Sequence, residues 1–510
     1  MRFEPSACAT DEPANTTPVT EENESFTENF PTDGENKNVE EQYADYSGAQ
    51  VFSVKLKSSE HKRMFQQLED RELIDVWLHK RSKKRSRAEF MVLRENMQEV
   101  LSLFYEADIQ PKIVIPNMQR LIEKEKKAET LTNSTLRSGH GMNWNEYHRY
   151  STIHSFLLHY ANAYPDICTL KTIGKTVENR DIQMLKISSG GNENKTAIFI
   201  DGGMHAREWI TPAAVTYIIK ELVDNRAKYR SFVDDVDFHI VPLVNVDGYE
   251  YSHTRDRLWR KNRADLWGPC NGVDLNRNFG YKWGTSGSSF IGCSQIYRGS
   301  AGFSEPESKA IRDYIMESTA NFQAYLSFHS YGQLILYPYG YANNELPSDA
   351  DDLKRLGNAA ASAVRKLSKT RYTVGNSAEV LYRSSGASDD WAKGEAGIKY
   401  SYVIELSDTG KYGFMLPERL IKPTAADALE IVKVVADEVM GLYEKKGLTM
   451  ILEAKLNASK ILEDDFRLVE RRPRSESRGV ASHWRPPPLS PGRSHPLVWP
   501  PGSCVVMRLA

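Results

Sequence analysis

Over residues 142–446 the chain alternates short apolar runs with longer stretches that have the period of an amphipathic helix. Short apolar strands that alternate with helices predict an α/β unit with a mixed, mainly parallel central sheet covered by helices on both faces. Ligands of such sheets bind beyond the carboxyl ends of the strands. The predicted strands are 197–200, 238–246, 324–328 and 400–406, and the predicted helices are 213–225, 305–318, 350–367 and 424–443.

A smaller unit precedes it, at residues 45–127. Its patterns predict the order strand, helix, strand, strand, helix, strand, helix, which is typical of a small ferredoxin-like α+β unit with helices on one face of an antiparallel sheet. Residues 128–141 are polar and lack periodicity, which predicts an exposed, protease-accessible linker. The elements are predicted at 51–54, 60–70, 72–78, 90–93, 94–107, 112–116 and 117–127.

The two ends of the chain lack the aliphatic residues that a core requires. Residues 1–44 are acidic and rich in Ser, Thr and Asn, and residues 447–510 are rich in proline, so both are predicted to be disordered. The first 40 residues contain no apolar segment like that of a secretion signal.

Composition excludes two classes of partner. The 66 Lys and Arg residues nearly balance 68 Asp and Glu residues, so a formal charge of -2 provides no field for nucleic acid or an anionic membrane. No apolar run approaches the roughly 18 to 20 residues of a membrane span. We therefore expect partners to be recognised at local sites, and we expect neither nucleic acid nor a membrane among them.

Two of the five cysteines lie close together in the sequence. Cys270 and Cys293 flank the Gly/Ser-rich loop 284–292, and a disulfide between them would indicate an oxidising compartment. Spacing alone leaves two unrelated reduced thiols equally open.

A candidate metal site follows the predicted strand 197–200. The glycines at 202 and 203 allow a sharp turn there, and His205 and Glu208 come next, at a spacing that lets both side chains face one point across a single helical turn. A catalytic zinc ion takes imidazole or carboxylate ligands and keeps one position for water, so a third protein ligand is required. His329 is the best candidate, because it ends the predicted strand 324–328.

These motifs resemble a known family. The segments His205–Trp209, His329–Tyr331 and Tyr402–Leu406 are together similar to the zinc metallocarboxypeptidases of the carboxypeptidase A/B family, over about residues 45–446. The resemblance implies one Zn²⁺ ion, bound by His205, Glu208 and His329.

Catalytic roles follow from the same resemblance. It implies that Glu405 is the general base that takes a proton from the attacking water, for which a carboxylate is suited. It also implies that Arg263 stabilises the oxyanion that develops on the scissile carbonyl, a task for a permanently charged donor.

Substrate-binding roles are implied in the same way. Asn276 and Arg277 match the pair that holds the terminal carboxylate of the substrate, which a guanidinium grips through two hydrogen bonds. Arg207 assists upstream, and Tyr382 matches a mobile tyrosine that closes over the bound terminus.

Specificity depends on Asp389 in this resemblance. Its position lies at the base of the pocket for the last side chain of the substrate, and it is aspartate in B-type enzymes and aliphatic in A-type ones. Asp389 therefore predicts a preference for C-terminal Lys or Arg, and Ser377 fits a roomier, polar pocket. The alternative is that Asp389 points into solvent.

The same resemblance also implies how the enzyme is activated and where it acts. It implies that residues 45–127 are an activation segment covering the cleft until a trypsin-like protease cuts the linker, that Cys270 pairs with Cys293, and that the zymogen is secreted. Two other functions stay open: a catalytically silent zinc protein that holds peptide C-termini, and a latent intracellular scaffold.

Overall fold

The computed structural model describes residues 43–80, 86–131, 140–190, 195–266, 268 and 270–441. The predicted tail, the last five residues of the predicted unit 142–446 and residues 1–42 lie outside these residues. Among the described residues, no helix has both the length and the apolar character that crossing a membrane needs.

The small unit contains a four-stranded antiparallel sheet in the order β2-β3-β1-β4. Helices α1 and α2 cover one face of this sheet, where Phe65 of α1 and Phe104 of α2 pack against Phe90 of β3. The predicted ferredoxin-like order is therefore present. The elements are β1 (Gln50–Leu56), α1 (Ser59–Asp70), β2 (Asp75–Lys80), β3 (Ser86–Val92), η1 (Arg94–Asn96), α2 (Met97–Glu106), β4 (Lys112–Ile115) and α3 (Met118–Leu131).

The large unit contains an eight-stranded mixed sheet in the order β11-β10-β12-β9-β7-β8-β6-β5. The four central strands β12, β9, β7 and β8 are parallel, and antiparallel pairs flank them on both sides. The strands are β5 (Cys168–Lys175), β6 (Asp181–Ile187), β7 (Thr196–Asp201), β8 (Val236–Val241), β9 (Asn321–Ser330), β10 (Leu334–Tyr337), β11 (Thr373–Asn376) and β12 (Tyr400–Leu406).

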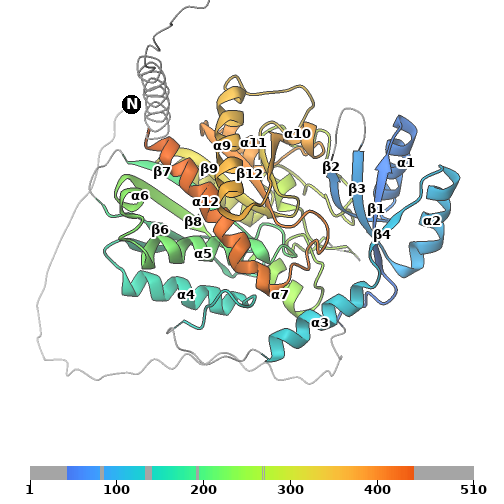
Figure 1. Ribbon diagram of the computed structural model, residues 1–510, viewed down its shortest axis with the longest axis horizontal. Helices are drawn as coiled ribbons and strands as arrows, with labels where there is room; N and C mark the ends of the chain where they lie inside the picture. Colours follow the sequence, from blue (N-terminus) through green and yellow to red (C-terminus); the bar gives the residue numbers. More distant parts are fainter. Residues whose placement is uncertain are drawn as a thin grey trace, which may run out of the picture. The chain divides into compact units, whose positions relative to one another are not determined.

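Helices cover the two faces of this sheet. On one face α5 and α12 lie side by side, and α9 lies next to α12 (Figure 1). On the other face α8 and α11 contribute to a buried cluster. The helices are α4 (Tyr150–Ala163), α5 (Ile210–Asp224), α6 (Arg230–Asp235), α7 (Val246–Thr254), η2 (Leu275–Arg277), α8 (Pro306–Glu317), α9 (Ala350–Ser368), α10 (Ser377–Val380), α11 (Ser388–Gly394), η3 (Glu418–Leu420) and α12 (Ile421–Val439).

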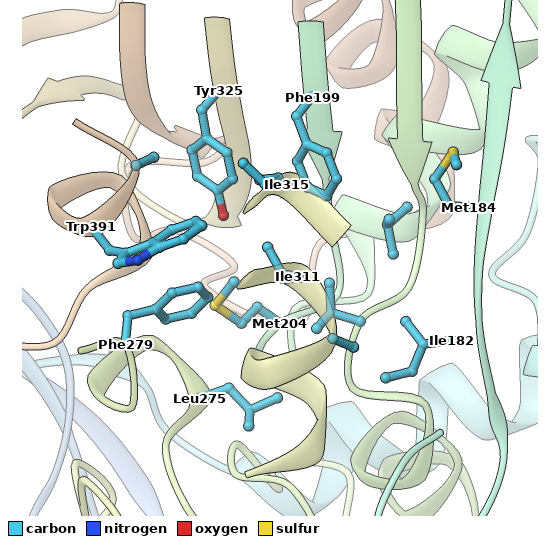
Figure 2. Close-up of a cluster of buried hydrophobic side chains, with 14 of the residues drawn as sticks. Ile182, Met184, Phe199, Met204, Leu275, Phe279, Ile311, Ile315, Tyr325 and Trp391 are labelled. Atoms are coloured by element: carbon cyan, nitrogen blue, oxygen red, sulfur yellow. The ribbon is translucent and has the colours of Figure 1, made fainter. Parts of the chain in front are cut away.

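The buried cluster under α8 and α11 lies next to the carboxyl ends of the central strands. Phe199 of β7 and Tyr325 of β9 stack with ring centroids 5.6 Å apart, and Trp391 of α11 lies beside them (Figure 2). Met204, which follows β7, belongs to the same cluster. The segment that leaves β7 toward His205 is thus anchored in the core.

The structure corrects the predicted boundaries of the small unit. Helix α3 continues to Leu131, so the first residues of the predicted linker are helical; Lys, Ala, Glu and Leu favour a helix there, and neither Pro nor Gly interrupts them. Ala44, predicted to be disordered, is ordered, and its N–H donates to Arg255 O at 2.8 Å.

The structure also corrects the predicted strand 238–246. Strand β8 ends at Val241, because Pro242 has no N–H for the ladder, and Asn245 caps α7 by accepting from Gly248 N. The sequence reading did not identify β5, β6, β10 or β11, which lie outside the central four strands.

Phe199→Ala is expected to lower the free energy of unfolding by about 3–5 kcal/mol, because it leaves a cavity in a fully buried cluster. Phe290→Ala is the matched control, since that ring is 76% exposed and its loss should change stability by no more than about 0.5 kcal/mol. Denaturant unfolding of both variants measures this. An equal loss of unfolding free energy in the two variants would contradict the placement of Phe199 in the core.

Candidate metal centre and active site

The first two candidate ligands lie in the turn between β7 and α5. Gly203 has φ +64°, and a Cβ there would lie 2.5 Å from Leu243 Cδ1, so only glycine allows this path. Glu208 N donates to His205 O at 3.2 Å, which closes a turn and brings the two side chains together. His205 and Glu208 therefore lie on a tight turn just before α5 rather than within a helix.

The third candidate ligand, His329, is the second-last residue of β9, the parallel neighbour of β7. Its Nδ1 lies 3.1 Å from Nδ1 of His205 and 3.2 Å from Oε2 of Glu208. His205 Nδ1 lies 2.8 Å from Glu208 Oε1, and all three side chains are buried. The three residues proposed as ligands thus converge on one point.

The donor set suits zinc. Two ligand atoms about 2.1 Å from one ion at a tetrahedral angle lie about 3.4 Å apart, close to the observed separations. Burial lowers the pKa of His205, and the charge of Arg260 lowers it further, so its ring favours the neutral form that binds metal. Two imidazoles and one carboxylate are also the ligand set of many catalytic zinc sites.

Asp274 fixes the orientation of His205. Its Oδ1 lies 3.1 Å from His205 Nε2, so this carboxylate accepts a hydrogen bond from Nε2–H and leaves Nδ1 without a proton and free for a metal. Burial alone would raise the pKa of Asp274, but Arg260 and Arg277 outweigh it and hold the pKa well below its usual range. Asp274 is therefore an anion at neutral pH.

Glu405 lies beside the ligands because β12 is the other parallel neighbour of β9, and Glu405 is opposite His329 in the register. Its side chain lines the same pocket as the three ligands. Burial raises the pKa of Glu405 to about 8, and the negative charge of Glu208 adds to this effect. A carboxyl group with a raised pKa is suited to accept and return a proton.

Arg263 lies outside this pocket, contrary to its predicted role. Its guanidinium packs over the rings of Tyr251 and Trp259, at 3.7 Å and 4.6 Å from their centroids, and its Nε lies 3.9 Å from Glu178. Arg260, three residues earlier, lines the pocket instead, with Nη2 2.9 Å from Asp274 Oδ2 and Nη1 3.8 Å from Glu208 Oε1. Of these two arginines, Arg260 is therefore the one that lines the pocket.

Asn276 and Arg277 of η2 line the pocket on a second side. Arg277 Nη1 donates to Asn276 O at 2.7 Å and its Nε donates to Gly287 O at 2.8 Å, which holds the guanidinium in place. Asn276 Oδ1 accepts from Ser388 N at 2.9 Å. Both side chains can present donors to a carboxylate.

Asp389, Ser377 and Tyr382 also line the pocket. Asp389 is only 2% exposed, so it does not point into solvent, and its Oδ2 lies 3.5 Å from Ser377 Oγ. Burial raises the pKa of Asp389 to about 6. Asp390 is occupied elsewhere, since it accepts from Gly340 N at 2.8 Å.

A disulfide joins Cys270 and Cys293, with Cα atoms 4.7 Å apart. The loop it closes contains Asp274, Asn276 and Arg277, so it restrains the residue that orients His205 and the two that face the pocket. The predicted pairing is present.

The small unit closes the pocket. Trp77 and Leu78 of β2 contribute to its lining, and the remaining volume of about 50 Å³ has room only for a few water molecules. Asp75 accepts from Arg207 at 2.6 Å, and Trp77 packs on Phe414 with ring centroids 4.9 Å apart. Arg207 is thus engaged by β2 outside the pocket.

Sequence reasoning missed Asp274 and Arg260 as site residues. Asp274 stands beside apolar Val273 and Leu275, and a carboxylate among buried residues is a signal for a partner. For Arg260 no such signal exists, because the segment 256–266 has no regular secondary structure whose period would tell which arginine faces inward.

Comparison with known families gives two matches. The family "Zinc carboxypeptidase" matches residues 153–431, and the family "Carboxypeptidase activation peptide" matches residues 52–125. The two matched segments correspond to the large and small units of the fold.

Individual proteins agree with these families. Carboxypeptidase B of Astacus astacus is 46% identical over 304 residues, which are 59% of this chain and 100% of the relative. Carboxypeptidase B of Rattus norvegicus is 36% identical over 401 residues, 77% of this chain and 94% of the relative. The crystal structure of a carboxypeptidase A from Helicoverpa armigera has a TM-score of 0.72 at 31% identity and covers 78% of this chain and 98% of its own.

His329→Ala is expected to reduce bound zinc from one ion per chain to almost none, since two ligands rarely retain a metal that needs three. His154→Ala is the control, because that ring contacts Gln183 Oε1 at 2.7 Å, away from the site, and should leave one ion bound. Metal analysis of the dialysed proteins measures both. Full zinc occupancy in His329→Ala would contradict the ligand assignment.

Proposed function

The chain belongs to the zinc carboxypeptidase family, and we propose that, as a B-type enzyme, it removes Lys or Arg from peptide C-termini. It is a metallocarboxypeptidase zymogen, with an activation peptide before the enzyme. The observation that carries the proposed specificity is a buried carboxylate, Asp389, in the pocket that also holds the ligand triad and Arg277.

The residues divide the reaction between them in this proposal. His205, Glu208 and His329 hold zinc, which when bound supplies a Lewis acid that polarises the scissile carbonyl and makes water a stronger acid. Glu405 accepts a proton from the attacking water and returns it to the leaving amine. Arg260 donates to the carbonyl oxygen as negative charge develops there.

Recognition of the chain terminus explains why only the last bond is cut. Arg277 and Asn276 bind the terminal carboxylate, and their anchoring by Gly287 O and Ser388 N keeps the donors oriented. Tyr382 closes over the bound residue. An internal peptide bond offers no carboxylate to this pair.

Asp389 sets the preference for a basic side chain. A carboxylate that is 2% exposed is stabilised by a cationic partner and destabilised beside an apolar one. The relatives named carboxypeptidase B, at 46% and 36% identity, support the same preference.

We propose that a trypsin-like protease activates the zymogen by cutting within residues 128–141, where Arg137 offers a basic cleavage site. Release of the small unit would then remove Asp75, Trp77 and Leu78 from the cleft. The Cys270–Cys293 disulfide supports secretion, because such bonds persist in oxidising compartments.

Trypsin-treated protein is expected to release C-terminal Lys and Arg from peptides much faster than Phe or Glu, and a zinc chelator should abolish all release. Asp389→Ile should lower the kcat/KM ratio of Lys over Leu peptides by about 100-fold or more, since a lost buried charge pair is worth about 3 kcal/mol. Mass spectrometry of the products measures both. Faster release of Phe by the wild type would overturn the pocket assignment, and no chelator-sensitive release would favour a silent peptide binder.

Arg260→Ala is expected to lower kcat by about 10²–10³-fold, the usual effect of removing an oxyanion donor. Arg263→Ala, a matched change three residues away, should leave kcat near that of the wild type, because its guanidinium packs on Tyr251 and Trp259. Steady-state kinetics on a C-terminal Lys peptide compare the two. A larger loss of kcat in Arg263→Ala than in Arg260→Ala would indicate that Arg263 stabilises the oxyanion instead.

A further inference from the structure

A second buried aspartate lies near the ligand site, next to His329 rather than His205. Asp201 is the last residue of β7, is 0% exposed, and is opposite Ser327 of β9 in the parallel register. Ser327 Oγ donates to Asp201 Oδ1 at 2.7 Å, and Ser327 Oγ also lies 3.1 Å from His329 Nε2. The contacts form a chain from Asp201 through Ser327 to the ring of His329.

We propose that Asp201 and Ser327 are positioning residues that act as a two-step relay, holding the proton of His329 on Nε2 so that Nδ1 is free for zinc. The inference rests on the zinc site of the proposed function. It gives His329 an indirect carboxylate partner, whereas His205 has a direct one in Asp274.

The hydrogens available to each group support the placement of the ring proton of His329 on Nε2. The serine hydroxyl has one hydrogen, and Ser327 donates it to Asp201 Oδ1. Ser327 Oγ is then an acceptor toward His329, and Nε2 must carry a hydrogen to donate to it. The bare nitrogen is Nδ1, which faces His205 Nδ1 and Glu208 Oε2.

Asn276 is a weaker alternative partner of the same nitrogen. Its Nδ2 lies 3.4 Å from His329 Nε2, farther than Ser327 Oγ, and its Oδ1 already accepts from Ser388 N. An amide N–H could only donate to Nε2, which would put the ring proton on Nδ1 and block metal binding. The relay and the ligand role of His329 therefore require each other.

The location of the relay explains the polar residues in an apolar layer. Asp201 ends the apolar run of β7, and Ser327 lies between Leu326 and Phe328, all of them buried. Burying a carboxyl group and a hydroxyl in a core costs free energy, because each polar group must be desolvated, and this cost indicates a role for the pair. Orientation of a metal ligand is such a role.

Zinc affinity tests the relay without using activity. Ser327→Ala and the isosteric Asp201→Asn are each expected to raise the zinc dissociation constant by about 10–100-fold in competition with a chelator. Ser308→Ala is the matched control, because that buried hydroxyl donates to Asn278 Oδ1 at 2.6 Å and should leave zinc affinity unchanged. Ser327→Thr keeps a hydroxyl at this position and should lose less zinc affinity than Ser327→Ala.

A double variant tests whether the two residues act in series. If Asp201 acts only through Ser327, Asp201→Asn added to Ser327→Ala should weaken zinc binding little further. Additive losses, or single variants with the affinity of Ser308→Ala, would overturn the relay while leaving wild-type zinc binding intact. A wild-type protein that binds no zinc would instead overturn the proposed function.

Discussion

Two ring nitrogens held 3.1 Å apart in a buried place are the constraint on which the site depends. Since Asp274 and Ser327 accept from the other nitrogens, the facing Nδ1 atoms of His205 and His329 carry lone pairs that repel each other unless a cation lies between them. The fold imposes this approach because β7 and β9 are parallel neighbours whose carboxyl ends meet at one edge of the sheet.

The neighbouring strand and the loop closed by the disulfide supply the other polar side chains around the two ring nitrogens. Strand β12 brings Glu405 opposite His329, and the loop closed by Cys270 and Cys293 brings Asp274 and Arg277. Asp274 links the parts, because it contacts His205, Arg260 and the backbone N–H of Asn276. A change in that loop should therefore affect ligand orientation and substrate binding together.

Sequence patterns predicted the central sheet and the site residues that lie at the ends of its strands. His329 lies near the end of a strand with a clear apolar run, so the parallel sheet and the place of this ligand could be inferred, whereas the role of Glu405 was implied by the family resemblance. The choice between Arg260 and Arg263 could not, because both stand in an irregular segment whose direction depends on distant contacts with Asp274 and Tyr251. Of the strands outside the central four, β10 and β11 were missed because they have only four residues each.

The central claim is that one zinc ion lies among His205, Glu208 and His329. Anomalous X-ray scattering from crystals of the protein, recorded on both sides of the zinc absorption edge, tests it most directly. The account predicts a single strong peak about 2.1 Å from Nδ1 of each histidine and within bonding distance of the Glu208 carboxylate. A zinc-replete crystal with no peak there, or with a peak coordinated by other residues, would contradict it.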